Sequence, residues 1–409
     1  DGFDTEPDPE HSGCGYALAQ GGDLFYFDVK TGRLKSIRPT EPDIKLRFNW
    51  NAGFARDPFD PATIYLGSQF VHRSLDRGAS WEIISPDLTS NNPEKQKYTE
   101  SGGLTPDVST AECHTTILCI APSPLKKGVI WVGTDDGNVQ LTRDDGKTWQ
   151  RVSHTIKEVP ACTWIPHVEA SKFNPAAAFV VFEDHRRANW TPYLFMTEDD
   201  GKTWKNLATK DIDGFIHVIE QDHKNENLLF LGTEFGLYFS LDKGKEWNKW
   251  TSGFPTVPVQ DLAVHPREND LIIGTHGRSI YILEDISFLR EISAAVLEKE
   301  AYLFQVQDAS RYMITRTVYH SSYLTHGDTE FIGQNSSTSA ELTFYYNPKE
   351  EPPNTAAGAK KDEKSAMNRP KTENPSPRSN EKKKFAIEIS DKDGKVVKKL
   401  KTTPKKGIN

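Results

Sequence analysis

Long apolar runs are missing from this 409-residue sequence, and no stretch approaches the roughly 20 apolar residues that a membrane helix requires. The chain also lacks a C-x-x-C pair, a nucleophile-elbow serine, a phosphate-binding glycine loop and a zincin motif. A transmembrane helix is therefore excluded, and no metal site and no cofactor is predicted. The sequence starts at Asp1 with no initiator methionine and no signal-like segment, which indicates a processed or truncated product.

Cysteine is scarce, with four residues at Cys14, Cys113, Cys119 and Cys162. Cys113 and Cys119 are predicted on one strand, where six residues at about 3.3 Å each separate them by roughly 20 Å. They cannot pair with each other, because a disulfide needs Cα atoms within about 7 Å. Cys162 could reach one of them from a neighbouring sheet, so the pairing and the redox compartment stay open.

Excess positive charge is absent from most of the chain. The net charge is −8, yet residues 347–409 carry 17 Lys and Arg against 9 Asp and Glu, which leaves −16 on the remainder. An acidic body argues against a nucleic-acid-binding core, and no nucleic acid partner is expected. The lysines of the basic segment are interleaved with Glu, Asp, Pro and Ser, which favours a solvated, flexible tail over an anion-binding surface.

One phrase is repeated: "TRDDGKTWQRV" and "TEDDGKTWKNL" are nearly identical, and "SLDRGASWEII" and "SLDKGKEWNKW" are looser copies. All four read Ser/Thr-x-Asp-x-Gly-x-x-Trp and follow a short apolar run, which predicts β-hairpin turns. The four sets are Ser74, Asp76, Gly78 and Trp81; Thr142, Asp144, Gly146 and Trp149; Thr197, Asp199, Gly201 and Trp204; and Ser240, Asp242, Gly244 and Trp247.

The chemistry of the phrase suits a structural role. Asp can accept hydrogen bonds from backbone N–H groups two residues on, Gly supplies a positive φ, and Trp buries apolar surface between sheets. Four equivalent catalytic acids in one chain make little sense. We therefore interpret the phrase as a device that fastens the turn.

The tryptophans are 68, 55 and 43 residues apart, and repeats of about 40 to 50 residues with four strands each predict a β-propeller. Five blades are expected at 2–39, 50–88, 113–153, 163–208 and 214–252, the first without the phrase. A sixth, 257–286, has three expected strands and leaves an edge that upstream chain or a partner must cover. The count predicts part of a longer or tandem propeller.

These phrases, with "VGTDDGNV", "GTEFGLYFS" and "GTHGRSIYILEDI", resemble the Asp boxes, or BNR repeats, of the sortilin (VPS10)-like bacterial family, which is related to sialidase-type propellers. The resemblance covers about residues 1–286. It implies an all-β propeller, but because such boxes occur in sialidases, xyloglucanases, sortilin receptors and photosystem-assembly propellers, it does not select one function.

The rest of the chain is expected to form a linker with one short helical turn over 287–339 and a partial β-sandwich over 340–409. "AELTFYY", "KFAIEIS" and "KVVKKL" read as strands, and Asp393-Gly394 predicts a hairpin between the last two. Residues 347–384, rich in Pro, Lys, Glu and Asn, are predicted to be a disordered insertion. The sandwich resembles the opening half of the immunoglobulin-like domain that follows such propellers.

Ligands of propellers usually meet the loops between the second and third strands, here 134–138, 183–190, 233–236 and 275–279. These loops predict a binding rim of Asp135, Asp136, Asp184, His185, Arg187, Glu234, His276 and Arg278. Mixed acid, His and Arg groups could hold a glycan, a carboxylate or a peptide terminus. The alternative is that they satisfy one another and the turns. His114, His167 and His217 fall in or beside inner strands, and we interpret them as buried, hydrogen-bonded histidines rather than as a metal set.

Two functions remain open. The favoured one is an exported, sortilin-like binding or scaffold propeller with a protein, peptide or glycan partner, no catalytic residue, and a secreted, periplasmic or cell-surface location. A missing segment of the same protein is another candidate partner. The alternative is a glycosidase: Arg187 and Arg278 could serve in a sialidase-like clamp, or Asp135 or Asp136 could oppose Glu234 as in a xyloglucanase.

Overall fold

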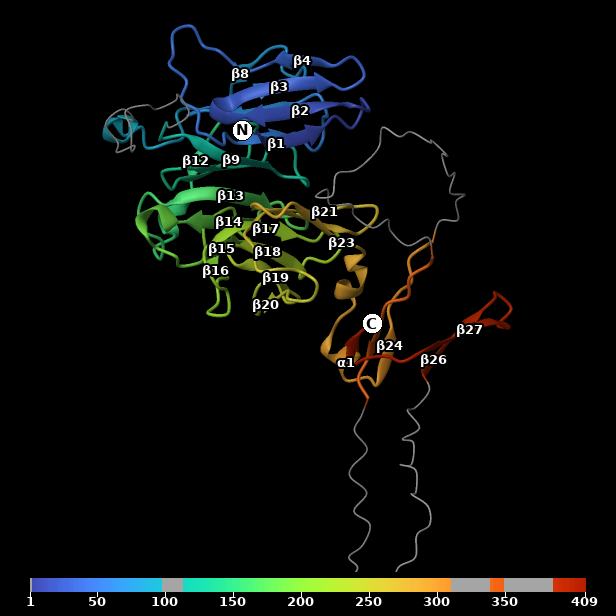
Figure 1. Cartoon of the computed structure of the whole chain (residues 1–409). Helices are drawn as coiled ribbons and strands as arrows, with labels where there is room; N and C mark the ends of the chain where they lie inside the picture. Colours follow the sequence, from blue (N-terminus) through green and yellow to red (C-terminus); the bar gives the residue numbers. More distant parts are fainter. Residues whose placement is uncertain (1, 98–112, 310–338, 349–384) are drawn as a thin grey trace, which may run out of the picture. The chain divides into compact units, whose positions relative to one another are not determined.

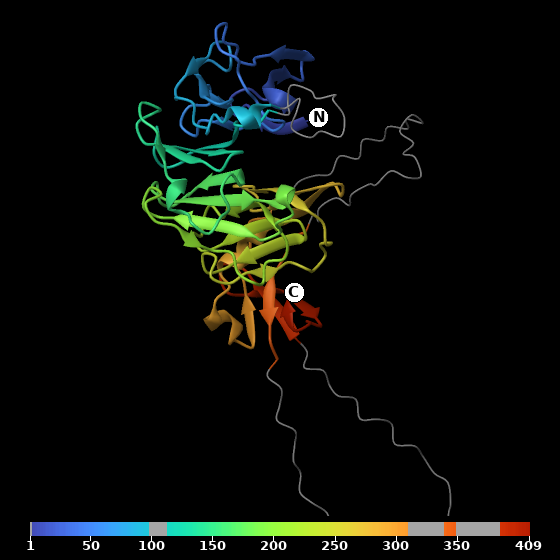
Figure 2. The same cartoon turned by 90° about the vertical axis from the view of Figure 1, so that its left-hand side faces the viewer.

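The computed structural model describes residues 2–97, 113–309, 339–348 and 385–409. Contacts divide the chain into two compact units, Asp1–Arg290 and Glu291–Asn409. The first unit consists of six antiparallel sheets that follow the chain order, and Figures 1 and 2 show this succession from the blue β1–β4 sheet to the β21–β23 sheet. The predicted all-β fold, built from four-stranded propeller-type sheets, is confirmed.

The first three sheets each have four strands, which pair with their neighbours in the chain. Sheet 1 contains β1 (Gly2–Pro7), β2 (Cys14–Ala19), β3 (Asp23–Asp28) and β4 (Arg33–Ser36); sheet 2 contains β5 (Phe54–Arg56), β6 (Ile64–Gly67), β7 (Val71–Ser74) and β8 (Glu82–Ile83); sheet 3 contains β9 (Ile117–Pro122), β10 (Ile130–Thr134), β11 (Val139–Thr142) and β12 (Gln150–Arg151).

Sheets 4 and 5 repeat this arrangement, and sheet 6 has three strands. Sheet 4 contains β13 (Trp164–Ala170), β14 (Ala178–Glu183), β15 (Tyr193–Thr197) and β16 (Lys205–Asn206); sheet 5 contains β17 (Ile216–Gln221), β18 (Leu229–Thr233), β19 (Gly236–Ser240) and β20 (Asn248–Lys249); sheet 6 contains β21 (Val259–Val264), β22 (Leu271–Thr275) and β23 (Ile280–Leu283). Short 3₁₀ turns lie at Gln20–Gly22, Pro93–Gln96, Ser153–Thr155, His185–Arg187 and Ile286–Arg290.

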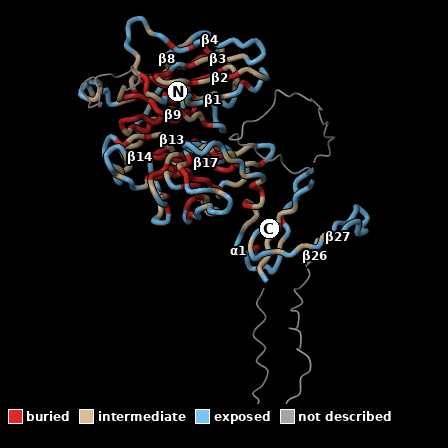
Figure 3. The backbone as a smooth tube through the Cα atoms, in the orientation of Figure 1, coloured by how far each residue is buried: buried red, intermediate tan, exposed pale blue. Residues whose placement is uncertain are grey.

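The second strands of sheets 2 to 5 are buried over their whole length, and Figure 3 shows red, buried segments around β14. β14 and β18 read "AFVVFE" and "LFLGT", continuous rather than alternating apolar runs, because neighbouring sheets cover both faces. Apolar clusters accordingly span consecutive sheets: one cluster contains Trp131 of sheet 3 with Ile165 and Phe182 of sheet 4, and another contains Phe179 of sheet 4 with Leu231 of sheet 5.

Sheet 6 differs from the others at its last strand. Ile280 of β23 pairs with Gly274 as Leu237 pairs with Gly232, Val139 with Gly133 and Val71 with Gly67. Leu237, Val139 and Val71 are 0% exposed, whereas Ile280 is 67% exposed. The face that is covered by the next sheet elsewhere in the unit is therefore open to solvent on β23.

The Asp boxes share one hydrogen-bond pattern, seen clearly in the second. The Thr142 hydroxyl donates to Asp144 Oδ1 at 2.9 Å and accepts from the Gly146 N–H at 3.0 Å. Asp144 also accepts from the Thr148 N–H at 2.9 Å and from its hydroxyl at 2.7 Å. The backbone donor is four residues after the Asp rather than two, because Asp145 (φ 62°) and Gly146 (φ 86°) both turn the chain in the left-handed region.

Each box tryptophan connects its sheet to the preceding one through the indole N–H. The acceptors are backbone carbonyls just after the fourth strand of the preceding sheet, so that Trp81 donates to Ile37 at 2.7 Å, Trp149 to Ile84 at 2.9 Å, Trp204 to Val152 at 3.2 Å and Trp247 to Leu207 at 2.9 Å. The box glycines approach the same four residues, and a Cβ on Gly146 would lie 2.6 Å from the Ile84 oxygen.

The second unit contains α1 (Ala294–Leu297) and two small sheets, β24–β25–β28 and β26–β27. Their strands are β24 (Ala301–Leu303), β25 (Phe344–Tyr346), β28 (Gly407–Ile408), β26 (Phe385–Ser390) and β27 (Val396–Thr402). The hairpin turn at Asp393-Gly394 is present, with φ 79° at Gly394. β24 lies within the range predicted to be a linker, and residues 349–384 of the predicted insertion lie outside the described residues.

Candidate functional site

A pocket of about 350 Å³ lies where sheets 4, 5 and 6 meet. Its walls come from the β14–β15, β18–β19 and β22–β23 loops and from the chain at the start of β17 and β21. We call it the loop-face pocket, and its lining residues are Glu183, His185, Arg186, Trp190, Phe215, His217, Glu234, Pro258, Gln260 and His276.

The β14–β15 connection brings four of these residues to the pocket. After β14 the chain forms the 3₁₀ turn His185–Arg187, which ends at Ala188 in the left-handed region (φ 57°). Asn189 then donates to Asp184 Oδ2 at 2.8 Å, which fastens the end of the turn to its start. Arg186 lies over the ring of Trp164 of β13, with 3.6 Å between the guanidinium carbon and the ring centre.

Glu183 is the buried acid of the pocket, with a side chain 7% exposed. Its Oε1 accepts from Arg186 at 2.7 Å and also contacts His185 Nδ1, and its Oε2 lies 3.6 Å from His217 Nδ1. Burial by itself raises the pKa of Glu183, but the neighbouring His217 imidazole and the charge of Arg186 outweigh it and lower that pKa overall. Both oxygens are thus engaged, and the carboxyl is held in its ionised form.

Aromatic rings form another wall of the pocket. The His185 and Phe215 rings are stacked with centroids 4.7 Å apart, and the centroid of the Trp190 ring lies 5.5 Å from that of Phe215. The His217 ring meets Phe215 edge-on at 4.8 Å. Phe215 is buried, whereas Trp190 is 55% exposed, so a large indole surface remains available to a ligand.

Glu234 is the second acid, carried by the β18–β19 loop. Its N–H donates to the Phe215 carbonyl at 3.1 Å, which fixes it beside the aromatic wall. Its Oε2 lies 3.2 Å from His217 Nε2, and the side chain is 30% exposed. Gln260 Nε2 also lies 3.2 Å from the same histidine nitrogen. His217 therefore sits between the two acids and links sheets 4, 5 and 6.

Three of the eight predicted rim residues line this pocket: His185, Glu234 and His276. Asp135 and Asp136 are buried in sheet 3 instead. Asp135 accepts from the Thr116 N–H at 2.9 Å and hydroxyl at 2.6 Å, and burial raises its pKa to about 7. Asp136 accepts from the Ser90 N–H at 2.6 Å. These two acids satisfy neighbouring turns.

The other three predicted rim residues are not in the lining. Asp184 is buried and pairs with Arg187 at 2.5 Å. Arg187 also donates to the Thr163 hydroxyl at 2.6 Å, so its guanidinium fastens the β14–β15 loop to the start of β13. Arg278 is exposed in the β22–β23 loop.

The predicted rim did not include seven lining residues: Glu183, Arg186, Trp190, Phe215, His217, Pro258 and Gln260. Glu183 and Trp190 are the first and last residues of a loop that was predicted to contribute to the rim. Including every residue of that loop would have included them. Phe215 and His217 alternate at the start of an inner strand, which puts them on one side. That spacing was the available signal for this wall.

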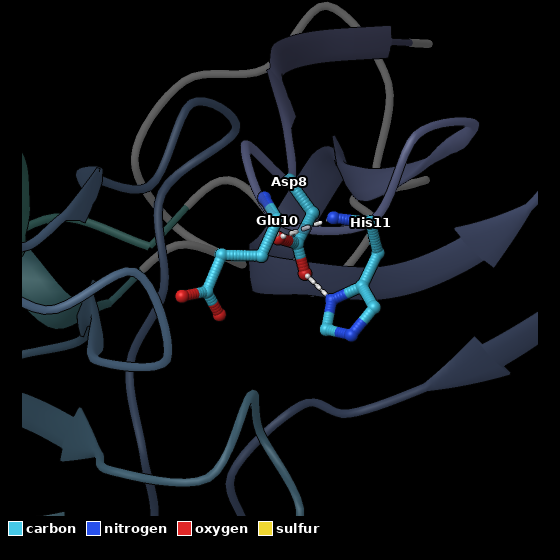
Figure 4. Close-up of side chains that lie close together, drawn as sticks. All are labelled: Asp8, Glu10 and His11. Carbon is cyan, nitrogen blue, oxygen red and sulfur yellow. Dashed lines mark hydrogen bonds and ion pairs between the residues drawn. The ribbon is translucent and has the colours of Figure 1, made fainter.

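One group among the described residues has Asp, Glu and His ligand atoms close enough to share an ion: Asp8, Glu10 and His11. Figure 4 shows the His11 ring turned toward the Asp8 carboxylate, with Nδ1 and Oδ2 3.0 Å apart. Arg77 of sheet 2 already donates to Asp8 Oδ2 at 2.8 Å and to Glu10 Oε2 at 2.5 Å. Its guanidinium occupies the place of a cation and joins sheets 1 and 2.

The charge of Asp8 follows from this pairing. Burial raises the pKa of the carboxyl, but hydrogen bonds from Arg77 and His11 and from the Glu10 N–H outweigh burial and hold the pKa well below its ordinary value. The group is therefore a structural ion pair between two sheets.

Comparison with known proteins gives a partial family match. Residues 193–322 match the family model described as sortilin, neurotensin receptor 3. The vacuolar protein sorting/targeting proteins 10 of Paracoccidioides brasiliensis and Paracoccidioides lutzii are 25% and 24% identical to the chain over 176 residues. The match covers 39% of this chain and 11% of each relative, so the chain spans about a tenth of their length.

Solved structures with similar folds have low sequence identity to the chain. The GH74 xyloglucanase from Xanthomonas campestris is 15% identical with a TM-score of 0.44, over 71% of this chain and 52% of that one. YCF48 bound to D1 peptide is also 15% identical with a TM-score of 0.44, over 71% and 82%. The extracellular domain of BT3049 from B. thetaiotaomicron is 15% identical with a TM-score of 0.46, over 69% and 33%.

Within the described residues, no helix has the length and apolar character needed to cross a membrane. The sheet order and the match over residues 193–322 together show a chain that is similar to the sortilin-like propellers.

Proposed function

We propose that this chain is a non-catalytic binding propeller that holds a protein or peptide partner in the loop-face pocket. The observation that carries the proposal is the pocket wall itself, in which Trp190 is 55% exposed against the buried Phe215. Exposed aromatic side chains on a rigid support are the anchors that dominate protein recognition. Because three sheets supply the pocket, its shape is set before a ligand arrives.

The partial sortilin match supports a protein or peptide as the partner, and a glycan is the second ligand class for the same aromatic wall. The match also supports a location outside the cytoplasm, secreted, periplasmic or at the cell surface.

A glycosidase is the second candidate, because Glu183 and Glu234 line one pocket and such enzymes use a pair of carboxyl groups. One member must act as an acid, which requires a raised pKa. The pKa of Glu183 is lowered instead, and Arg186, His185 and His217 already surround its oxygens. This arrangement favours binding over proton transfer.

The test is an array of immobilised peptides probed with the parent chain and with Trp190→Ala. The control is Phe59→Ala, which removes a 46% exposed aromatic residue of sheet 2 outside the pocket. We expect the parent and Phe59→Ala to bind the same peptides, and Trp190→Ala to bind them at least 10-fold more weakly.

Equal binding by the Trp190→Ala variant would contradict the proposed site, and an array with no bound peptide would contradict the proposed function. A parallel assay with sialosides and xyloglucan oligosaccharides is expected to show no hydrolysis. Turnover that disappears in Glu183→Gln would establish the glycosidase instead.

A further inference from the structure

We infer that the loop-face pocket takes a cationic side chain of the bound peptide, a lysine or an arginine, between Trp190 and Glu234. This inference rests on the proposed function and adds the chemical class of the ligand group.

The charges of the pocket are the first argument. Its lining contains two acids, Glu183 and Glu234, and one permanent cation, Arg186. The charge of Arg186 is balanced within the protein, because the guanidinium pairs with Glu183 at 2.7 Å and lies 3.6 Å from the centre of the Trp164 ring. One negative charge is left over when the histidines are neutral, and Glu234 carries it.

The surroundings of Glu234 are the second argument. Within the described residues its carboxylate is paired with His217 alone, through Oε2 at 3.2 Å. Its side chain is 30% exposed, compared with 7% for Glu183. A carboxylate that is partly exposed in a concave site and lacks a permanent counter-charge attracts a ligand cation.

The position of the aromatic rings is the third argument. Phe215 contacts both Glu234 and Trp190, since its carbonyl accepts a hydrogen bond from the Glu234 N–H at 3.1 Å and its ring centroid lies 5.5 Å from that of Trp190. Phe235, next to Glu234 in the chain, is 39% exposed. An ammonium or guanidinium group beside Glu234 would thus have aromatic side chains nearby, and ring faces attract cations through the ring quadrupole.

The volume of the pocket and the sign of its charge both agree with a cationic side chain as the ligand group. The volume of about 350 Å³ is at the lower end of the roughly 300–1,000 Å³ of ligand pockets, which suits one long side chain with part of its backbone. A ligand carboxylate would face the uncompensated charge of Glu234, and like charges repel it.

The experiment uses blocked tripeptides, acetyl-Gly-Xaa-Gly-amide, in which Xaa is Lys, Arg, norleucine or Glu, titrated into the whole chain by calorimetry. Norleucine has the four-carbon chain of lysine without the terminal ammonium group. We expect Lys and Arg to bind at least 10-fold more tightly than norleucine, Glu to bind most weakly, and the preference to shrink as salt increases.

Variants of the chain test whether Glu234 causes the preference for a cationic side chain. Glu234→Gln is expected to reduce Lys binding to the level of norleucine and to leave norleucine unchanged, whereas Glu234→Asp keeps the preference. The matched control is Glu226→Gln in the same sheet, where Glu226 is 51% exposed and pairs with Lys243 at 3.3 Å. Trp190→Ala is expected to weaken all four tripeptides.

The inference is overturned if norleucine binds as tightly as Lys, if Glu binds best, or if Glu234→Gln keeps the Lys preference. It is also overturned if no tripeptide binds while peptides of the array do. Those results do not contradict the proposed function. If neither the peptides of the array nor the tripeptides bind, both the inference and the proposed function are refuted.

Discussion

Gly146→Ala should destabilise the first unit more than the same change at another left-handed glycine. Gly146 has φ 86°, and its new Cβ would lie 2.6 Å from the Ile84 oxygen and 3.0 Å from the Ile84 Cβ. Placing alanine in the left-handed region costs about 1–2 kcal/mol. Because the close atom is a backbone oxygen, sheets 2 and 3 must also separate at this point.

That separation weakens the hydrogen bond from Trp149 Nε1 to the same Ile84 oxygen, which is 2.9 Å long. Loss of such a bond costs about 1 kcal/mol, so the expected total for Gly146→Ala is about 2–3 kcal/mol. The melting temperature should fall by about 3–5 °C for a cooperative unit of this size.

Gly32→Ala is the matched control, because Gly32 has φ 67° and no atom within 4 Å of the added Cβ. It should lose about 1–2 kcal/mol, the conformational part alone. Differential scanning calorimetry of the two variants and the parent measures the difference. Equal losses in the two variants would refute a close approach between sheets at the box, and a parent-like melt with lost peptide binding would make the box a ligand site.

Three further changes test other parts of the structure. Arg77→Met should cost about 2–4 kcal/mol, because Asp8, whose side chain is 0% exposed, loses its counter-charge. The loss should shrink as the pH falls below about 4, because Asp8 of the unfolded chain then gains a proton that the paired carboxylate of the folded parent refuses. Burial lowers the pKa of His72 to about 4, so between pH 6.5 and 4 the unfolded chain binds a proton that the folded chain refuses. As the pH falls through this range, the free energy of unfolding should decrease by up to about 1.4 kcal/mol per pH unit because of this residue. His72→Gln should remove that part of the slope. Arg278→Ala should leave the melting temperature within about 1 °C, because Arg278 is exposed.

Urea unfolding at several pH values measures the first two changes, and calorimetry measures the third. An Arg77→Met loss that stays constant with pH would contradict the ion pair with Asp8. Identical pH slopes for the parent and His72→Gln would show that His72 is not the titrating group, and a large fall in melting temperature for Arg278→Ala would make that residue structural.

The box phrases predicted the fold because their information is local. The Ser or Thr hydroxyl, the Asp and the Gly of one box bind within eight residues, and the Trp at its end marks where the next sheet is joined. Strands without such markers were not predicted. β24 and β28 contain three and two residues, which is too few for the alternation of apolar and polar residues in a strand to be recognised.

The site was predicted only in part because its composition depends on which loops meet. Asp135 and Glu234 hold equivalent places after the second strands of their sheets, yet Asp135 is 0% exposed and binds Thr116, whereas Glu234 lines the pocket. Nothing in the two loop sequences distinguishes these environments. The two-residue spacing of Phe215 and His217 puts them on one side of their strand, but it does not specify the packing of sheets 4, 5 and 6 that forms the pocket beside them.

Hydrogen–deuterium exchange of the whole chain, with and without a peptide selected on the array, locates the binding site. We expect protection of residues 183–190 and 233–236, which flank the loop-face pocket, and unchanged exchange at the box turns 142–149 and 197–204. Protection confined to the box turns or to the second unit would contradict the claim that this pocket is the binding site.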